Sequence, residues 1–504
     1  DTVNANIDTA FVAGAVATIT LTAPVNGAVA DGADTNQVDA LVEDANGNPI
    51  TGAAVVFSSA NGATILSSTM NTGVNGVAST LLTHTVAGTS NVVATVDTVN
   101  ANIDTAFVPG AVATITLTTP VNGAVADGAN SNSVQAVVSD SEGNAVAGAA
   151  VVFSSANATA QITTVIGTTG ADGIATATLT NTVAGTSNVV ATIDTVNANI
   201  DTAFVAGAVA TITLTAPVNG AVADGVNTNS VQAVVSDSGG NPVTGATVVF
   251  SSTNATAQIT TVIGTTGADG IATATLTNTV AGTSNVVATV DTVTNNIDTV
   301  FVAGAVATIT LTTPVNGAVA DGTDSNHVQA VVSDSDGNPV TGAAVVFSSA
   351  NATAQITTVI GTTGADGIAT ATLTNTVAGT SNVVATVDTV NANIDTAFVA
   401  GAVATITLTT PVNGAVADGA NSNSVQAVVS DSDGNPVTGA AVVFSSANAT
   451  AQITTVIGTT GADGIATATL TNTVAGTSNV VATIDTVNAN IDTAFVAGAV
   501  ATIT

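Results

Sequence analysis

The sequence contains no lysine and no arginine among 504 residues, against 33 aspartates and glutamates, so its formal charge at pH 7 is −33. Nucleic-acid binding needs cationic side chains that displace counterions from phosphates. Binding to anionic lipid headgroups also needs basic clusters. The composition therefore excludes both partners. The uniform negative charge favours solubility and makes neighbouring segments repel one another, which favours an extended chain.

Cysteine, tryptophan and tyrosine are also absent. No disulfide can cross-link the chain, and without lysine no Lys–Asn isopeptide bond can form. Tryptophan and tyrosine provide the stacking surfaces that are common in sugar binding and in protein interfaces. We therefore expect stiffness to come from packing or bound ions, and any ligand to bind through backbone or hydroxyl groups.

Long apolar runs are absent too, although the mean hydropathy is +0.55. Threonine, asparagine, aspartate and glycine interrupt every run before it reaches the roughly 18 residues that a membrane helix requires. No membrane insertion is predicted for this segment. The chain begins DTVNANIDTAF rather than with methionine and a basic region, so we interpret it as an internal or processed fragment.

One repeat organises the chain. The string DTVNANID, or a close variant, begins at Asp1, Asp97, Asp194, Asp291, Asp388 and Asp485. A period near 97 residues suits one complete small domain per repeat. The predicted units are 1–14 as the last strand of a preceding repeat, 15–110, 111–207, 208–304, 305–401 and 402–498 as immunoglobulin-like repeats, and 499–504 as the first strand of a following repeat.

Short segments of strand character recur within each repeat, separated by turn residues. Their spacing of 8 to 14 residues predicts an all-β chain of tandem immunoglobulin-like sandwiches with about seven strands each. In the 111–207 repeat the predicted strands are 111–118, 133–140, 149–154, 161–166, 173–180, 188–193 and 200–205. Phe153 and Phe204, the only aromatic residues of this repeat, are predicted to fill its core.

The repeats follow one another without a flexible linker. Residues 204–210 read FVAGAVA, which passes from the last strand of one copy to the first strand of the next. Short connections restrict hinge motion. We expect a semi-rigid rod with a length of about 40 Å per domain.

Several strings of the repeat resemble the group 1 bacterial immunoglobulin-like domain of intimin, invasin-type adhesins and related inverse autotransporters. They are ADG at 126–128, DSDGNPVTG at 431–439, AVVFSS at 441–446, TGADGIATATL at 460–470 and AGTSNVVAT at 475–483. The resemblance covers the whole chain. It implies an Ig-like spacer in an exported surface protein whose adhesive activity lies in a terminal domain.

Candidates for catalysis are few. A serine or threonine nucleophile needs an activating base, and the only histidines are His84 and His327. Each occurs in one copy, with Asn181 at the position that corresponds to His84 and Ser424 at that of His327. We expect both histidines to face solvent, and we predict no catalytic or organic cofactor site and no enzymatic activity.

Calcium is the one cation to consider, although the domains require no cofactor. Asp431, Asp433 and Asn435 place oxygen ligands at alternate positions of a glycine-bearing turn, as hard cations prefer. The equivalent residues Asp334, Asp336 and Asn338 form a second candidate. The other copies read DANGN, DSEGN and DSGGN, so the number of ligands varies.

A further candidate is a cation site at a joint, where Asp194 and Asp201 would approach Asp224 of the next domain. Both cation candidates compete with simple counterion screening of the acidic chain.

The sequence leaves three functions open. The first is a structural stalk of a bacterial cell-surface adhesin, located outside the cell and presenting a distal tip. The second is a subunit of a self-assembling extracellular filament or biofilm fibre. The third is a multivalent module that binds a glycan or protein weakly and gains avidity from its copies. The expected partners are neighbouring repeats and, in the second case, other copies; a receptor or glycan target is not identified.

Overall fold

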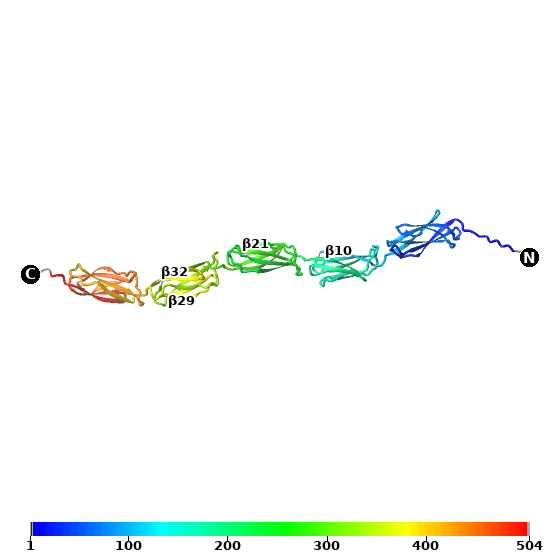
Figure 1. Cartoon of the computed structure of the whole chain (residues 1–504). Coiled ribbons are helices and arrows are strands. Elements are labelled where there is room, and N and C mark those ends of the chain that lie inside the picture. The colour runs from blue at the N-terminus through cyan, green and yellow to red at the C-terminus, as the bar shows by residue number, and fades with distance from the viewer. Residues whose placement is uncertain (1, 3, 501–504) are drawn as a thin grey trace.

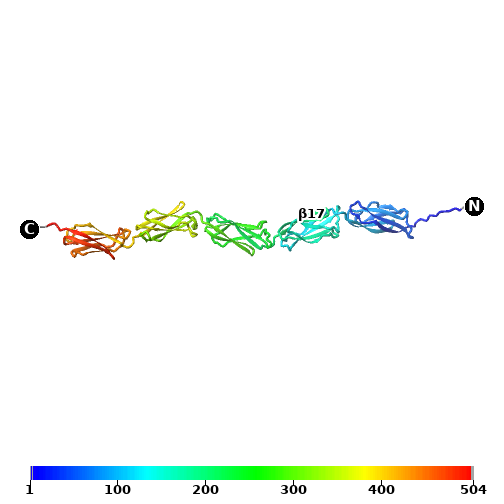
Figure 2. The same ribbon diagram turned by 90° about the horizontal axis from the view of Figure 1, so that it is seen from below.

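The computed structural model describes residues 2 and 4–500 as five β-sandwiches in a row (Figures 1 and 2). The described residues contain no helix, and none of them forms a helix long and apolar enough to cross a membrane. Each sandwich contacts only its neighbours along the chain. The result is the extended rod that the short connections predict.

The sandwiches contain seven to nine strands each. The first has β1 (Val16–Val25), β2 (Ala28–Val29), β3 (Asn36–Asp44), β4 (Ala54–Ser59), β5 (Thr64–Ile65), β6 (Thr69–Asn71), β7 (Val77–Thr83), β8 (Gly88–Val96) and β9 (Val99–Val108). The second has β10 (Thr114–Val121), β11 (Ala124–Val125), β12 (Ser131–Ser139), β13 (Val152–Ser155), β14 (Gln161–Ile166), β15 (Ile174–Thr180), β16 (Gly185–Ile193) and β17 (Val196–Val205).

The remaining three sandwiches repeat this order. The third has β18 (Thr211–Val218), β19 (Asn229–Ser236), β20 (Val249–Ser252), β21 (Gln258–Ile263), β22 (Ile271–Thr277), β23 (Gly282–Val290) and β24 (Val293–Phe301). The fourth has β25 (Thr308–Val315), β26 (Ala318–Val319), β27 (Ser325–Ser333), β28 (Val346–Ser349), β29 (Gln355–Ile360), β30 (Ile368–Thr374), β31 (Gly379–Val387) and β32 (Val390–Val399). The fifth has β33 (Thr405–Val412), β34 (Ser422–Ser430), β35 (Val443–Ser446), β36 (Ala451–Ile457), β37 (Ile465–Asn472), β38 (Gly476–Ile484) and β39 (Val487–Phe495).

Two sheets face each other in every sandwich. In the second domain the strand orders are β10-β12-β15-β14 and β11-β17-β16-β13. Neighbours pair antiparallel, except that the short β11 runs parallel to the end of β17, with Ala124 opposite Phe204. All seven predicted strand segments of this repeat are found; the two-residue β11 was not predicted.

The last strand is longer than predicted because a tight turn precedes it. Asp194 adopts a positive φ of 50°, a conformation that aspartate tolerates better than most residues. The turn brings Val196 opposite Ile193, so that β17 begins at Val196 rather than at residue 200. The missed stretch is rich in exposed asparagine and lacks the apolar alternation by which strands are recognised.

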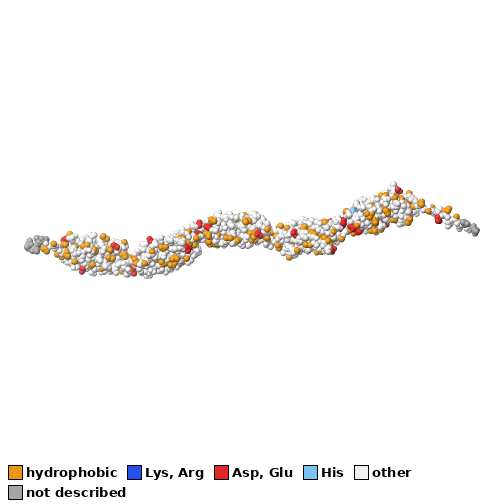
Figure 3. All heavy atoms as spheres, in the orientation of Figure 1, with side chains coloured by type: hydrophobic (Ala, Val, Ile, Leu, Met, Phe, Trp, Pro, Cys, Tyr) orange, Lys and Arg blue, Asp and Glu red, His pale blue; other side chains and the backbone are white. Residues whose placement is uncertain are grey.

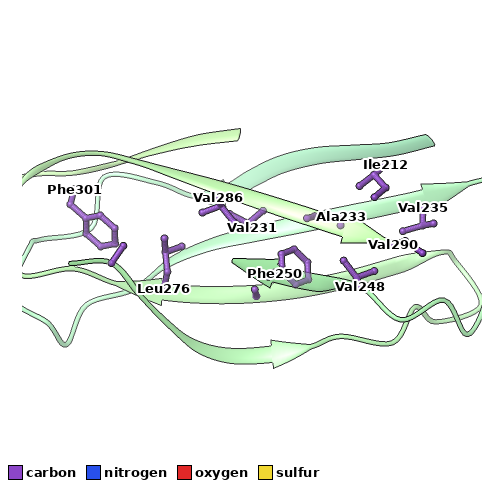
Figure 4. Close-up of a cluster of buried hydrophobic side chains, with 14 of the residues drawn as sticks. Ile212, Val231, Ala233, Val235, Val248, Phe250, Leu276, Val286, Val290 and Phe301 are labelled. Carbon is purple, nitrogen blue, oxygen red and sulfur yellow. The ribbon is translucent and has the colours of Figure 1, made fainter. Parts of the chain in front are cut away.

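The core is formed by small residues and two phenylalanines per domain. Inward positions alternate with half-buried ones along the long strands, as in β19, where Val231, Ala233 and Val235 are fully buried. Phe250 lies near the middle of the core, and Phe301 lies toward one end beside Leu276 (Figure 4). The predicted core positions of Phe153 and Phe204 are confirmed, with 8% and 3% of their surface exposed.

The first domain differs from the others around His84. The ring is half-buried and packs edge-on against Phe107, with ring centroids 5.7 Å apart. Its Nδ1 accepts the backbone N–H groups of Thr85 and Val86. The expectation that His84 faces solvent is therefore met only in part, because one side of the half-buried ring packs against Phe107 while its hydrogen bonds lie at the exposed turn. His327, on the outer face of β27, is exposed as predicted.

One buried hydroxyl of the first domain has lost the donors that it has in the other domains. In the second domain Oγ of Ser187 accepts Nδ2 of Asn181 at 3.0 Å and Nδ2 of Asn157 at 3.2 Å. In the first domain His84 replaces the first asparagine and Asn61 donates to the carbonyl oxygen of Thr89 instead, so Ser90 Oγ is buried with no hydrogen-bond partner among the described residues. A buried unpaired hydroxyl costs about 1–3 kcal/mol.

We predict that Phe204→Ala destabilises the second domain by about 3–5 kcal/mol, because the cavity cannot be refilled by small neighbours. Calorimetry of the whole chain should show one domain melting before the other four, which act as internal references. Val152→Ala is the control, since 65% of Val152 is exposed. A single unsplit transition for Phe204→Ala would contradict the core assignment.

We predict that His84→Asn stabilises the first domain by about 1 kcal/mol, because the new amide satisfies the Ser90 hydroxyl. The lost contact with Phe107 opposes this gain in part. His84→Ala removes the ring without restoring the hydrogen bond and should destabilise the domain. Equal melting of the Asn and Ala variants would show that the hydroxyl does not matter.

The chain ends lie outside the sandwiches. Residues 2 and 4–14 form no strand and are mostly exposed, and residues 499 and 500 also form no strand. The strands predicted for 1–14 and 499–504 would need hydrogen-bond partners in further repeats, so they stay predictions. Residues 1, 3 and 501–504 lie outside the described residues.

Candidate functional site at the domain joints

The glycine-bearing turns that the sequence singles out lie at the joints between domains. Each has the pattern D-x-x-G-N and follows the second long strand of its sandwich, at the end that faces the preceding domain. In the third domain Oδ1 of Asp237 accepts the backbone N–H groups of Gly239 and Asn241 at 2.9 and 2.8 Å. The carboxylate thus fixes the turn and the position of Asn241.

The side chain of Asn241 reaches across the joint. Its Nδ2 donates to the carbonyl oxygens of Ala126 and Thr182 in the preceding domain at 3.3 and 3.1 Å. Its Oδ1 accepts the backbone N–H of Ala184 at 2.8 Å. Only 4% of Asn241 is exposed. One buried amide therefore makes three hydrogen bonds to the neighbouring domain.

The same arrangement occurs at all four joints. The asparagines and their partners across the joint are Asn144 with Ala30, Thr85 and Ala87; Asn338 with Ala223, Thr279 and Ala281; and Asn435 with Ala320, Thr376 and Ala378. Among the described residues, no other hydrogen bond links one sandwich directly to the next.

The connector between sandwiches is held by the same turn. Between the second and third domains it spans residues 206–210, and the backbone N–H of Gly207 donates to Oδ2 of Asp237 at 2.8 Å. A Cβ at Gly207 would lie 3.3 Å from Cγ1 of Val125. This tight packing favours glycine, and it fixes the connector between the two domains.

The carboxylates of these turns are stabilised in their ionised form. Burial by itself would raise the pKa of Asp431, but hydrogen bonds from Gly401, Asn435 and Asp433 outweigh it and lower the pKa below its usual value. Asp140, Asp237 and Asp334 are held in the same way. A second set of turns acts similarly: the backbone N–H groups of Asn130 and Ala129 lower the pKa of Asp127.

The calcium candidates occupy these turns. Asp431 and Asn435 are buried, whereas Asp433 is exposed. Oδ1 of Asp431 accepts the backbone N–H groups of Asp433 and Asn435, and Oδ2 accepts Gly401 N–H and Asn435 Nδ2. A cation would have to displace these donors.

Asp334, Asp336 and Asn338 repeat this pattern. Within residues 2 and 4–500, no three His, Cys, Asp or Glu side chains are grouped so that they could hold a metal.

The predicted approach of Asp194 and Asp201 to Asp224 is wrong. Asp194 lies beside residues 110–112 at the opposite end of its own domain. Asp201 is on the outer face of β17, where Asn188 donates to it at 2.7 Å. Asp224 adjoins Ala223, whose carbonyl faces the fourth domain. Sequence reasoning also missed the role of the asparagine, because only the fold shows that the turn faces another domain.

The fold and joints define a tandem array of immunoglobulin-like sandwiches. Residues 18–108, 114–205, 211–302, 308–399 and 405–496 each match the family model described as bacterial Ig-like domain (group 1). The chain belongs to this family, as the sequence motifs indicated.

Several solved structures are similar to this chain. Invasin, described as a bacterial integrin-binding protein, is 22% identical, with 80% of this chain and 82% of invasin covered and a TM-score of 0.42. FdeC, an Escherichia coli adhesin, is 23% identical, with coverage of 58% and 99% and a TM-score of 0.43. InvD of Yersinia pseudotuberculosis is 20% identical, with coverage of 57% and 97% and a TM-score of 0.41.

We predict a loss of stability in acid. Since the folded pKa of these aspartates is lowered, their contribution is fully present above the unfolded value of about 3.9 and is lost as pH falls through the folded pKa. The melting temperature should drop steeply below about pH 4. At pH 7, Asp431→Asn should destabilise the fifth domain, whereas the exposed Asp433→Asn should not. Equal effects of the two variants would contradict the role given to Asp431.

Proposed function

We propose that this chain is a spacer segment in the stalk of a bacterial cell-surface adhesin, located outside the cell, which holds a distal tip away from its anchor. The observation that carries the proposal is the regular joint: five sandwiches connected end to end, each held to the next by a buried asparagine. Such an array spans a long distance with few degrees of freedom.

The strand order within each domain also supports a load-bearing role. The chain enters the second sandwich through β10 and leaves through β17 at the opposite end. Tension would pull β11 and β17 in opposite directions along their length. Their hydrogen bonds, from Ala126 N–H to Val205 O and from Gly123 N–H to Ala203 O, would therefore be loaded together rather than one after another. All five domains contain this parallel contact.

The surface supports a spacer more than a binding module. Acidic side chains are scattered along the face that Figure 3 shows, and the chain has no lysine or arginine to pair with them. Among the described aromatic residues, every phenylalanine outside the N-terminal segment is buried. The described sandwiches therefore expose no phenylalanine on which a sugar ring could stack. Self-assembly into a filament is the second candidate, and association of purified rods would favour it.

We also propose that the D-x-x-G-N turns of the fourth and fifth domains bind calcium weakly. The carboxylate and amide oxygens of Asp431, Asp433 and Asn435, and of their counterparts in the fourth domain, are the ligand types that calcium prefers. Because donors already occupy the buried oxygens, binding would be no tighter than the roughly millimolar range of extracellular modules. Titration calorimetry that detects saturable binding in the micromolar range would contradict this limit.

We predict that the number of repeats sets the reach of a displayed epitope. The chain would be displayed on a bacterial surface with an epitope at its outer end, in versions of five, three and one repeat. Antibody access through a surface polysaccharide layer should fall as repeats are removed, because each repeat contributes about 40 Å. An epitope on a flexible linker of equal residue number is the control. Access that is independent of repeat number would contradict the spacer function.

A further inference from the structure

An open cleft adjoins the asparagine contact at three of the joints. The asparagine of the D-x-x-G-N turn forms the three hydrogen bonds described above. A cleft of about 370 Å³ is found with similar lining at the second, third and fourth joints. At the second joint it is lined by Ala184, whose N–H Asn241 accepts, by Pro242, and by Phe204 and Ala206 of the preceding domain and connector, among others. The two domains are therefore hydrogen-bonded at the turn and separated by open space directly beside it.

We propose that the asparagine of each D-x-x-G-N turn is an interdomain clamp that sets the angle between consecutive sandwiches, and that the joint bends toward the adjoining cleft when the clamp opens. The inference concerns the joints themselves and holds whether or not the rod is a spacer.

Within the turn, one residue positions another: Asp237 holds Asn241, and Asn241 contacts the preceding domain. Asp237 holds Asn241 through its backbone N–H at 2.8 Å and through Nδ2 at 3.1 Å, and it also holds the connector at Gly207. The orientation of the amide is fixed by its surroundings, because Nδ2 faces two carbonyl oxygens and Oδ1 faces an N–H. Asp237 is thus a positioning residue, and Asn241 makes the contact across the joint.

Burial makes the clamp sensitive to substitution. Only 4% of Asn241 and 2% of Ala126 is exposed, so removal of the amide would leave the carbonyl oxygen of Ala126 without its donor in a buried position. Leaving such groups unpaired is unfavourable. When the amide is removed, opening of the joint lowers the free energy, because water can then reach the carbonyl oxygens and pair with them. The adjoining cleft leaves space into which the joint can then bend.

The first domain supplies a matched control. Asn48 occupies the same turn position and donates to Asp44, but among the described residues it contacts no preceding domain and is exposed. Substitution of Asn48 therefore removes the bonds within the turn without touching a joint.

The test is electron microscopy of the full chain, with the angle at each joint measured on individual particles. Asn→Ala at 144, 241, 338 and 435 together should broaden the distribution of angles at all four joints and shorten the mean end-to-end distance, with an unchanged contour length. Asn48→Ala should leave every angle distribution as in the parent chain. Distributions as narrow in the fourfold variant as in the parent would overturn the proposal.

A single variant keeps the test valid if the fourfold variant does not fold. Asn241→Ala should broaden only the second joint from an N-terminal marker, with the other three joints as internal references. Asn241→Asp keeps the size of the side chain but presents a carboxylate to Ala126 O and Thr182 O, so it should broaden that joint as well. A parent-like second joint in Asn241→Asp would show that packing, rather than the amide donors, sets the angle.

Discussion

The arrangement of this chain depends on one hydrogen-bonded amide at each joint. Each sandwich packs its own core of small residues. The hydrogen bonds between the domains join main-chain groups of one domain to a single asparagine side chain of the next. Because the partners are main-chain carbonyl and N–H groups, the joint tolerates changes in neighbouring side chains. The third position of the turn varies in this way among the second to fifth domains, where it is Glu142, Gly239, Asp336 and Asp433.

The residue types that are common in this sequence divide between the core and the surface of each sandwich. Alanine and valine fill the inward positions of the long strands, and two phenylalanines close each core. Threonine, serine and asparagine occupy many of the outward positions, where some pair across strands, as Asn188 does with Asp201. Valine and isoleucine side chains such as Val152 and Ile166 are exposed among them. This surface carries carboxylates but no lysine or arginine. It offers neighbouring rods no ion pairs, which suits a module that must stay extended and separate.

The sequence predicts the fold well because the strands alternate regularly and the repeat marks each domain. It does not predict β11, which has only two residues, or the start of β17, where asparagines break the apolar pattern. It assigns His84 to solvent, since the pairing of Asn181 with Ser187 is visible only in three dimensions. It singles out the D-x-x-G-N turn as a candidate cation site, and the role of this turn at the joint is visible only in the structure. The same oxygens bind backbone donors here, and local sequence does not distinguish the two uses.

Two causes for an extended chain can be separated by salt: repulsion among 33 carboxylates and fixed joints. The direct measurement is small-angle X-ray scattering of the purified chain at low salt and at 1 M salt, where the Debye length falls to about 3 Å. The account predicts the same maximum dimension, near 200 Å for five sandwiches, in both conditions. A rod that contracts at high salt would show that charge repulsion, and not the clamped joints, keeps the domains in line.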